Sequence, residues 1–248
     1  MCLLQKLSEN YKRISIVGMA KNAGKTTALN YLIEEAMDEG LTLGVTSTGR
    51  DGEGTDIVTG TDKPRIYLDT DTIVSVPKQL YALADAGLEI LKMTEYGTAL
   101  GQLMLCRVAD AGYVQVAGPV INAQHIQMCE EMLALGADLV LIDGAIDRKS
   151  IAAPDISDAI ILSTGAVLSR KLNKVVEETA QYVLASEFAE DEASGMALYG
   201  AHGEVRYLGI WYYLFLVNLL CQFSQACAKD DGCFRLCRHL GLEPFSGF

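Results

Sequence analysis

The chain has 248 residues, of which 50% are hydrophobic, and this is enough to bury the core of one α/β domain, alone or with an appendage. Its net charge of −12 works against binding to nucleic-acid phosphates and to anionic membrane surfaces, so we expect neither as a partner. No apolar signal-peptide stretch follows the first residues, and Cys2, Cys106 and Cys129 are scattered like free thiols, which predicts a cytoplasmic protein.

Short apolar runs, typical of buried strands, alternate with stretches of helical periodicity along the chain. Apolar residues in the predicted helix 26–38 recur at the spacing of one helix face, at Ala28, Leu29, Leu32, Ile33 and Ala36. The other predicted helices span 78–92, 122–135 with Asn122 as the N-cap, and 169–188. The predicted strands span 13–19, 41–48, 65–68, 72–76, 102–108, 113–117, 138–142 and 159–162, with a hairpin of 196–199 and 204–208. This alternation predicts an α/β fold whose sheet is mostly parallel and carries helices on both faces.

A glycine-rich segment joins the first predicted strand to the first predicted helix. It reads Gly18-Met-Ala-Lys-Asn22-Ala23-Gly24-Lys25-Thr26-Thr27. Backbone N–H groups and the positive end of a helix can hold a triphosphate there, while Lys25 reaches the β- and γ-phosphates and Thr26 takes a magnesium ion. We therefore predict a P-loop NTPase with a Walker A loop, in which these named residues bind ATP and Mg²⁺. A chance Gly-Lys-Thr at a helix start is the alternative, and the strand before it and the helix after it argue against that alternative.

The spacing within this loop is one residue longer than usual, because five residues separate Gly18 from Gly24. The same longer spacing resembles the loop of dethiobiotin synthetase and its relatives. Lys21 lies four residues before Lys25, one short of the extra lysine of the Mrp/MinD-type loop, so it receives no such role.

An acidic residue must complete a magnesium site of this kind, at the end of a neighbouring strand. Asp143 follows the apolar run 139–142 and is our candidate metal ligand and catalytic residue, the alternative being a turn aspartate beside Gly144. The loop 49–62 offers Arg50 for charge stabilisation during catalysis and Asp51 as a second metal contact, or else is simply an acidic surface loop.

Two further segments follow predicted strand ends. Gly118-Pro119 and Asn122 either line the same cleft or form a tight turn. Residues 163–166 follow the next strand, where related folds contact the base, and they lack the Asn-Lys-x-Asp signature of GTP-binding proteins, so the sequence favours ATP.

The end of the chain has a different character, so we divide the protein into a P-loop NTPase domain, 1–209, and an apolar, cysteine-rich tail, 210–248. Residues 207–228 carry no charge, but Asn218 and Gln222 interrupt them, so we expect a buried helix or a partner surface rather than a membrane span. Four cysteines of the tail lack the paired Cys-x-x-Cys spacing of a zinc site, which is therefore not predicted.

Together these segments resemble the reactivating factor of adenosylcobalamin-dependent lysine 5,6-aminomutase. The resemblance covers residues 12–209 and is carried by ISIVGMAKNAGKTTALNYLI, GVTSTGRDGEGTDIVTGTDKPRIYL, VQVAGPVINAQ, LVLIDGAIDRKSIAAP and ILSTGAVLSRKLNKVVEETA. It implies an ATPase subunit that acts with a second ATPase subunit on the inactivated aminomutase, exchanging its damaged cobalamin for intact coenzyme.

Two other functions stay open at this point. The chain could be a ligase of the dethiobiotin synthetase type, in which ATP activates a carboxylate or carbamate and the loop 49–62 binds substrate. It could also be a nucleotide-dependent regulator of another metalloenzyme. Fold alone does not separate these functions.

Overall fold

A computed structural model of the chain describes residues 3–20, 23–48, 66–144, 156–185, 196–200, 203–207 and 212–215. These residues fall into two compact units. The first lies within Met1–Val17 and Thr26–Ile160, and the second within Gly18–Lys25 and Ile161–Phe248.

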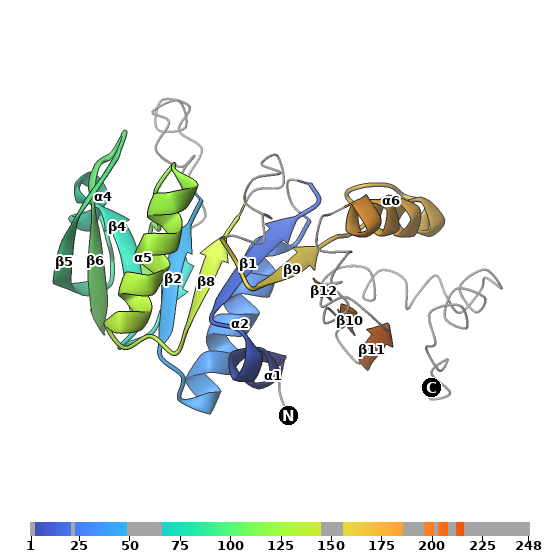
Figure 1. The fold of residues 1–248 in the computed structure, drawn as a ribbon, viewed down its shortest axis with the longest axis horizontal. Helices are drawn as coiled ribbons and strands as arrows, with labels where there is room; N and C mark the ends of the chain where they lie inside the picture. Colours follow the sequence, from blue (N-terminus) through green and yellow to red (C-terminus); the bar gives the residue numbers. More distant parts are fainter. Residues whose placement is uncertain are drawn as a thin grey trace. The chain divides into compact units, whose positions relative to one another are not determined.

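A mixed β-sheet forms the centre of the first unit (Figure 1). Its strands run in the order β1 (Arg13–Gly18), β8 (Leu139–Asp143), β2 (Leu43–Ser47), β4 (Ile73–Pro77), β6 (Gly101–Asp110) and β5 (Gly87–Thr98). The pairs β1–β8, β8–β2 and β2–β4 are parallel, whereas β4–β6 and β6–β5 are antiparallel. The α/β fold is therefore confirmed, with a parallel centre, but the β6–β5 side is antiparallel, which the sequence analysis did not foresee.

Helices cover both faces of this sheet. Helix α5 (Asn122–Ala134) lies in front of it in Figure 1, and α2 (Lys25–Glu39) and α1 (Leu3–Asn10) lie behind. Met128, Cys129 and Met132 of α5 share a buried cluster with Val140 and Ile142 of β8. Because β8 is covered on both sides, its apolar residues 139–142 are all fully buried, as a central parallel strand requires.

The predicted face of α2 is confirmed, since all five of its apolar residues are buried. Helix α1 was not predicted, although Leu4 and Leu7 show helical spacing, and both are fully buried. The backbone N–H of Leu4 donates to Glu35 Oε2 of α2 at 2.9 Å, which joins the two helices.

The helix predicted over residues 78–92 is wrong. Only one helical turn forms, α4 (Lys78–Tyr81), and the chain then turns into the twelve-residue strand β5. Leu88 and Ile90 instead pair with Val108 and Cys106 of β6, so strand pairing overrides a local helical pattern. The predicted strand 113–117 is likewise shorter, because β7 (Gly112–Val114) pairs only with β3 (Ile66–Leu68) in a separate two-stranded sheet.

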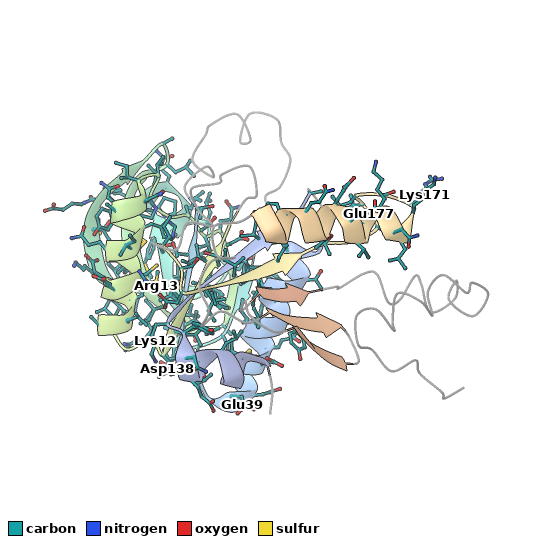
Figure 2. The ribbon with its side chains drawn as sticks, turned by 45° about the vertical axis from the view of Figure 1, so that its right-hand side comes forward. Lys12, Arg13, Glu39, Asp138, Lys171 and Glu177 are labelled. Atoms are coloured by element: carbon teal, nitrogen blue, oxygen red, sulfur yellow. The ribbon has the colours of Figure 1, made fainter. Side chains whose placement is uncertain are left out.

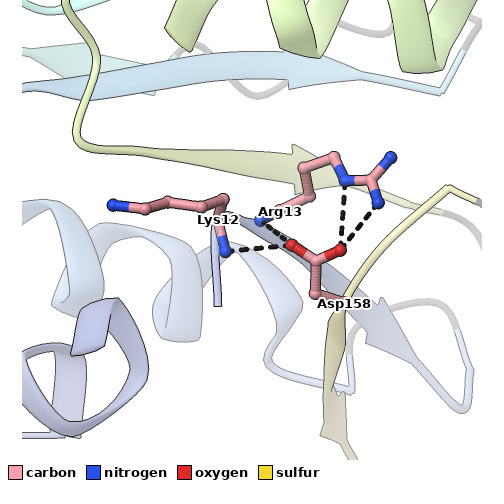
Figure 3. A network of polar contacts seen from close by, with 3 residues as sticks. All are labelled: Lys12, Arg13 and Asp158. Carbon is pink, nitrogen blue, oxygen red and sulfur yellow. Dashed lines mark hydrogen bonds and ion pairs between the residues drawn. The ribbon is translucent and has the colours of Figure 1, made fainter. Parts of the chain in front are cut away.

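Ion pairs and hydrogen bonds gather at the amino ends of the central strands, where Lys12, Arg13 and Asp138 lie (Figure 2). Lys12 Nζ donates to the carbonyl oxygen of Asp138 at 3.0 Å, and Asp138 Oδ2 accepts the backbone N–H of Thr42 at 2.8 Å. The carboxylate of Asp158 accepts hydrogen bonds from both Lys12 and Arg13 (Figure 3). These contacts join the starts of β1, β8 and β2 and the segment that precedes β9 at the amino end of the sheet.

The second unit contains most of β9 (Ala159–Ser163), α6 (Leu172–Ala185) and three further strands. The predicted hairpin is confirmed as β10 (Met196–Gly200) paired antiparallel with β11 (Gly203–Tyr207). Strand β12 (Tyr212–Phe215) pairs parallel with β10, so these residues of the predicted tail form a strand and not a helix. The rest of the tail, including its four cysteines, lies outside the described residues.

Two predicted helix starts need correction. Helix α6 begins at Leu172 and not at Ser169, whose Oγ instead accepts the backbone N–H of Lys171 at 3.1 Å. Asn122 is the first helical residue of α5 and not its N-cap, because the N-cap is Ile121, which makes no side-chain capping bond. None of the helices in the described part of the chain is long and apolar enough to span a membrane.

Candidate functional site

A loop joins the end of β1 to the start of α2. Strand β1 ends at Gly18, the N–H of Ala23 donates to the carbonyl of Ala20 at 3.2 Å, and α2 begins at Lys25. The two ends of the loop lie close together, since a Cβ atom at Gly18 would lie 3.4 Å from Lys25 Cβ. The backbone N–H of Met19 donates to the carbonyl of Ser163 at 2.9 Å, which fixes the start of the loop against β9 within the second unit.

Gly24 is the residue on which this turn depends. Its φ is 95°, a left-handed conformation that side chains rarely adopt, and it stands directly before α2. The first N–H groups of a helix have no partner within the helix, so the turn presents donors and the positive end of the helix dipole together. Lys25 and Thr26 open the helix and are both partly exposed, and Thr27 is exposed.

Gly18, Ala23, Gly24 and Lys25 thus share one loop, and Thr26 and Thr27 continue it along the chain into α2. Asn22 lies outside the described residues, as do Arg50 and Asp51 of the loop 49–62. The roles given to these three residues remain predictions.

Asp143 stands at the carboxyl end of β8, in the first unit, as the strand pattern predicts. It is in register with Ile16 of β1 on one side and Ser47 of β2 on the other. Its carbonyl accepts the N–H of Thr48 at 2.9 Å, and the N–H of Gly144 donates to the carbonyl of Ile16 at 2.9 Å. The backbone of Asp143 is therefore held on both sides, and its side chain is partly exposed.

Buried hydroxyl groups lie beside this edge, and the sequence analysis missed them. Ser75 Oγ contacts Thr46 Oγ1 at 2.8 Å and donates to the carbonyl of Ala117, while Thr46 Oγ1 lies 3.7 Å from Met128 Sδ. The available signal was the presence of hydroxyl residues, Thr46 and Ser47 in β2 and Ser75 in β4, in strands that are otherwise apolar. These contacts tie β2 and β4 to the segment that leads into α5.

Gly118 is pressed against the carboxyl end of β2. A Cβ atom there would overlap the carbonyl oxygen of Ser47 and would lie 2.7 Å from Thr46 Oγ1, so only glycine fits. Gly118 and Pro119 are both buried, in the irregular segment between β7 and α5 that bends at residues 120 and 121. Direct contact of Gly118 or Pro119 with a ligand therefore receives no support.

The segment after β9 is also largely internal. Ser163 and Thr164 are buried, and Thr164 Oγ1 lies 3.0 Å from Thr179 Oγ1 of α6, which itself donates to the carbonyl of Val175 at 2.7 Å. Because the Thr179 proton is used in that bond, Thr164 is the donor between the two hydroxyls. Gly165 is buried as well, and among residues 163–166 only Ala166 is partly exposed. The contact with a nucleotide base remains a prediction.

Within the described ranges, no group of three or more His, Cys, Asp and Glu side chains is arranged to hold a metal ion. The magnesium site predicted here is of another kind, because it uses one threonine, one aspartate and the phosphates of the ligand. No protein-family model matches the chain, and no curated protein matches it either.

Proposed function

We propose that the chain binds ATP with Mg²⁺ and hydrolyses it, and that it uses this reaction to reactivate a cobalamin-dependent aminomutase. The observation that carries the nucleotide part is Gly24, which adopts a φ of 95° between the end of β1 and the first residue of α2. A strand, a glycine turn and a helix start in direct succession favour an anion at the turn.

The residues present suit such a ligand. Lys25 would supply positive charge for the β- and γ-phosphates, and Thr26 a hydroxyl ligand for magnesium. Asp143 would supply the carboxylate, directly or through water, from the carboxyl end of β8. Magnesium bound there neutralises charge that develops on the phosphates during transfer. Arg50 and Asp51 would complete the site.

The aminomutase part of the proposal rests on the sequence resemblance. A radical mutase that loses its adenosyl group holds a dead cofactor tightly, and release requires a more open state of the enzyme. A second protein can drive that opening only if its nucleotide states differ in affinity for the two states of the mutase. Partners of the proposal are therefore a second ATPase subunit and the aminomutase itself.

Calorimetric titration with ATP and Mg²⁺ tests the nucleotide site. Lys25→Ala should weaken binding by about a hundredfold, since it removes a charged contact of about 3 kcal/mol, and should leave the fold intact. Lys78→Ala is the matched control, because Lys78 is also the first residue of a helix and is exposed. Equal ATP affinity in wild type and Lys25→Ala would contradict the proposed role of Lys25 in ATP binding.

The metal role is tested by steady-state hydrolysis. Asp143→Asn should abolish magnesium-dependent turnover with a smaller effect on ATP binding. Asp138→Asn, at the residue that precedes the same strand, should keep its turnover. Unchanged turnover in Asp143→Asn would transfer the metal role to another residue.

The biological role is tested with an aminomutase that turnover has inactivated. The protein with its partner subunit, ATP, Mg²⁺ and fresh adenosylcobalamin should restore activity, and Lys25→Ala should not. If nothing is restored and a small carboxylate stimulates ATP hydrolysis instead, the ligase function replaces this one.

A further inference from the structure

Helix α5 begins close to the carboxyl end of β2, and one buried histidine lies in its first turn. His125 is only 2% exposed, and its backbone N–H donates to the carbonyl of Ile121 at 3.0 Å. Its imidazole also hydrogen-bonds the backbone of Pro119, six residues earlier. The side chain therefore reaches back to the turn that precedes the helix.

The hydrogen bonding of the ring identifies which nitrogen makes this contact. Nε2 is buried and has no hydrogen-bond partner among the described residues, so Nδ1 is the atom that faces Pro119. A carbonyl oxygen only accepts, so Nδ1 must carry the proton. Burial lowers the pKa of His125 to about 4, which leaves the ring neutral near pH 7 with this single proton.

The turn held by His125 is pressed onto β2. Gly118, the residue before Pro119, leaves no room for a side chain against the carbonyl of Ser47. The residue after Ser47 is Thr48, whose N–H and Oγ1 both reach the carbonyl oxygen of Asp143, at 2.9 and 3.4 Å. A continuous path of contacts thus runs from the imidazole, through the turn and the end of β2, to the backbone of Asp143.

We propose that His125 is a positioning residue, which holds the Gly118–Pro119 turn against β2 and thereby fixes Thr48 beside Asp143. His125 touches no ligand in this role. Its link to magnesium rests on the function proposed for Asp143, while its effect on Thr48 does not depend on that function. The side chain acts at a distance because Gly118 and Ser47 meet backbone to backbone and cannot yield independently.

Two substitutions of the full-length protein separate this role from general packing. His125→Asn places an amide donor near the position of Nδ1, whereas His125→Gln places it near that of Nε2. Both replacements are polar and uncharged. The asparagine variant should keep the bond to Pro119, and the glutamine variant should lose it.

Amide hydrogen exchange supplies the first readout. His125→Gln should speed exchange of the Thr48 amide by about tenfold and His125→Asn by less than about twofold, because loss of one buried hydrogen bond changes local opening by about that factor. The Val140 amide, bonded to the carbonyl of Lys12 at the opposite end of the sheet, is the internal control. An unchanged Thr48 rate, or an equal rise at Val140, would overturn the proposal.

A second measurement needs no variant and covers the case in which the glutamine protein does not fold. The ¹⁵N shifts of the imidazole in the wild-type protein report its tautomer. Protonation at Nδ1 is expected, and protonation at Nε2 would overturn the proposal.

The third readout concerns the metal. His125→Gln should raise the Mg²⁺ concentration for half-maximal ATP hydrolysis by about tenfold, with ATP affinity in the absence of Mg²⁺ unchanged. If the wild type neither binds nor hydrolyses ATP, the proposed function fails and the exchange data still decide the role of His125. If the wild type hydrolyses ATP and the half-maximal Mg²⁺ concentration stays the same in His125→Gln, the link to the metal is wrong.

Discussion

The carboxylate of Asp158 accepts hydrogen bonds from both the side chain and the backbone N–H of Arg13. Asp158 Oδ1 accepts from the guanidinium at 2.7 and 3.2 Å, and Oδ2 accepts the N–H of Arg13 at 2.8 Å and that of Lys12 at 2.9 Å. One carboxylate therefore caps the start of β1 and joins it to the chain that enters β9.

Replacing this carboxylate should cost stability. Asp158→Asn should lower the free energy of unfolding by about 1 kcal/mol, a value reduced from that of a fully buried charged pair because both side chains are partly exposed. Urea denaturation measures it. Glu178→Gln, which breaks the exposed Lys174–Glu178 pair on α6, is the control and should cost less than about 0.5 kcal/mol. Equal losses in the two variants would contradict a special role for Asp158.

The hydrogen bonds of Asp158 should also make the free energy of unfolding depend on pH in the acid range. Burial raises the pKa of the Asp158 carboxyl, but hydrogen bonds from Arg13 and the two backbone N–H groups outweigh this and bring the pKa below its ordinary value of 3.8. Its stabilisation is therefore complete above 3.8 and is lost as the pH falls through the lower, folded-state pKa. The difference in unfolding free energy between wild type and Asp158→Asn should shrink in that range, and a constant difference would contradict it.

Burial of His125 should lower the free energy of unfolding in a pH range above that of Asp158. Burial lowers its pKa from 6.5 to about 4, so the unfolded chain binds a proton in this interval and the folded chain does not. The free energy of unfolding should fall as the pH drops from 6.5 towards 4, by up to about 3 kcal/mol. Stability curves of wild type and His125→Asn should converge with falling pH, and parallel curves would show that His125 is not buried neutral.

Gly24 and Gly18 offer a matched pair within one loop. Gly24→Ala should lower the free energy of unfolding by about 1 to 2 kcal/mol, because alanine is strained at a φ of 95°. At Gly18 a Cβ atom would meet its neighbours no closer than 3.4 Å, so Gly18→Ala should cost less than about 0.5 kcal/mol. Thermal denaturation compares the two, and an equal effect would argue against the left-handed turn.

Two thiols of the first unit should be inert in the folded protein. Burial raises the pKa of Cys106 to about 11 and that of Cys129 to about 12. At about pH 8 fewer than about one in a thousand of either thiol is ionised, and both side chains are fully buried. Iodoacetamide labelling followed by peptide mapping should find both unmodified until the protein is unfolded. Rapid labelling of Cys129 in native protein would contradict its place on the buried face of α5.

The sequence predicted an element correctly where a single local pattern determines it. The helix face of α2 and the strand that ends at Asp143 follow from periodicity and from an unbroken apolar run. The helix prediction for residues 78–92 was wrong because the local pattern is helical. The strand that forms instead depends on pairing with residues 101–110, which no local pattern reveals. Thr46, Ser75 and His125 were missed for a related reason, since their partners lie far away in the sequence or in a turn whose packing requires the fold.

Strand β5 has a consequence for the behaviour of the protein at high concentration. It is the last strand of the first unit's sheet, and an exposed strand edge invites pairing with another chain. Its pairing with β6 shifts register at three places, and it displays Glu89, Lys92 and Glu95. An incoming strand would meet backbone donors and acceptors that fall out of phase after a few residues, beside charges that resist dehydration. The register shifts and charges of β5 therefore work against its pairing with a second chain, although they also make the strand hard to predict from the sequence.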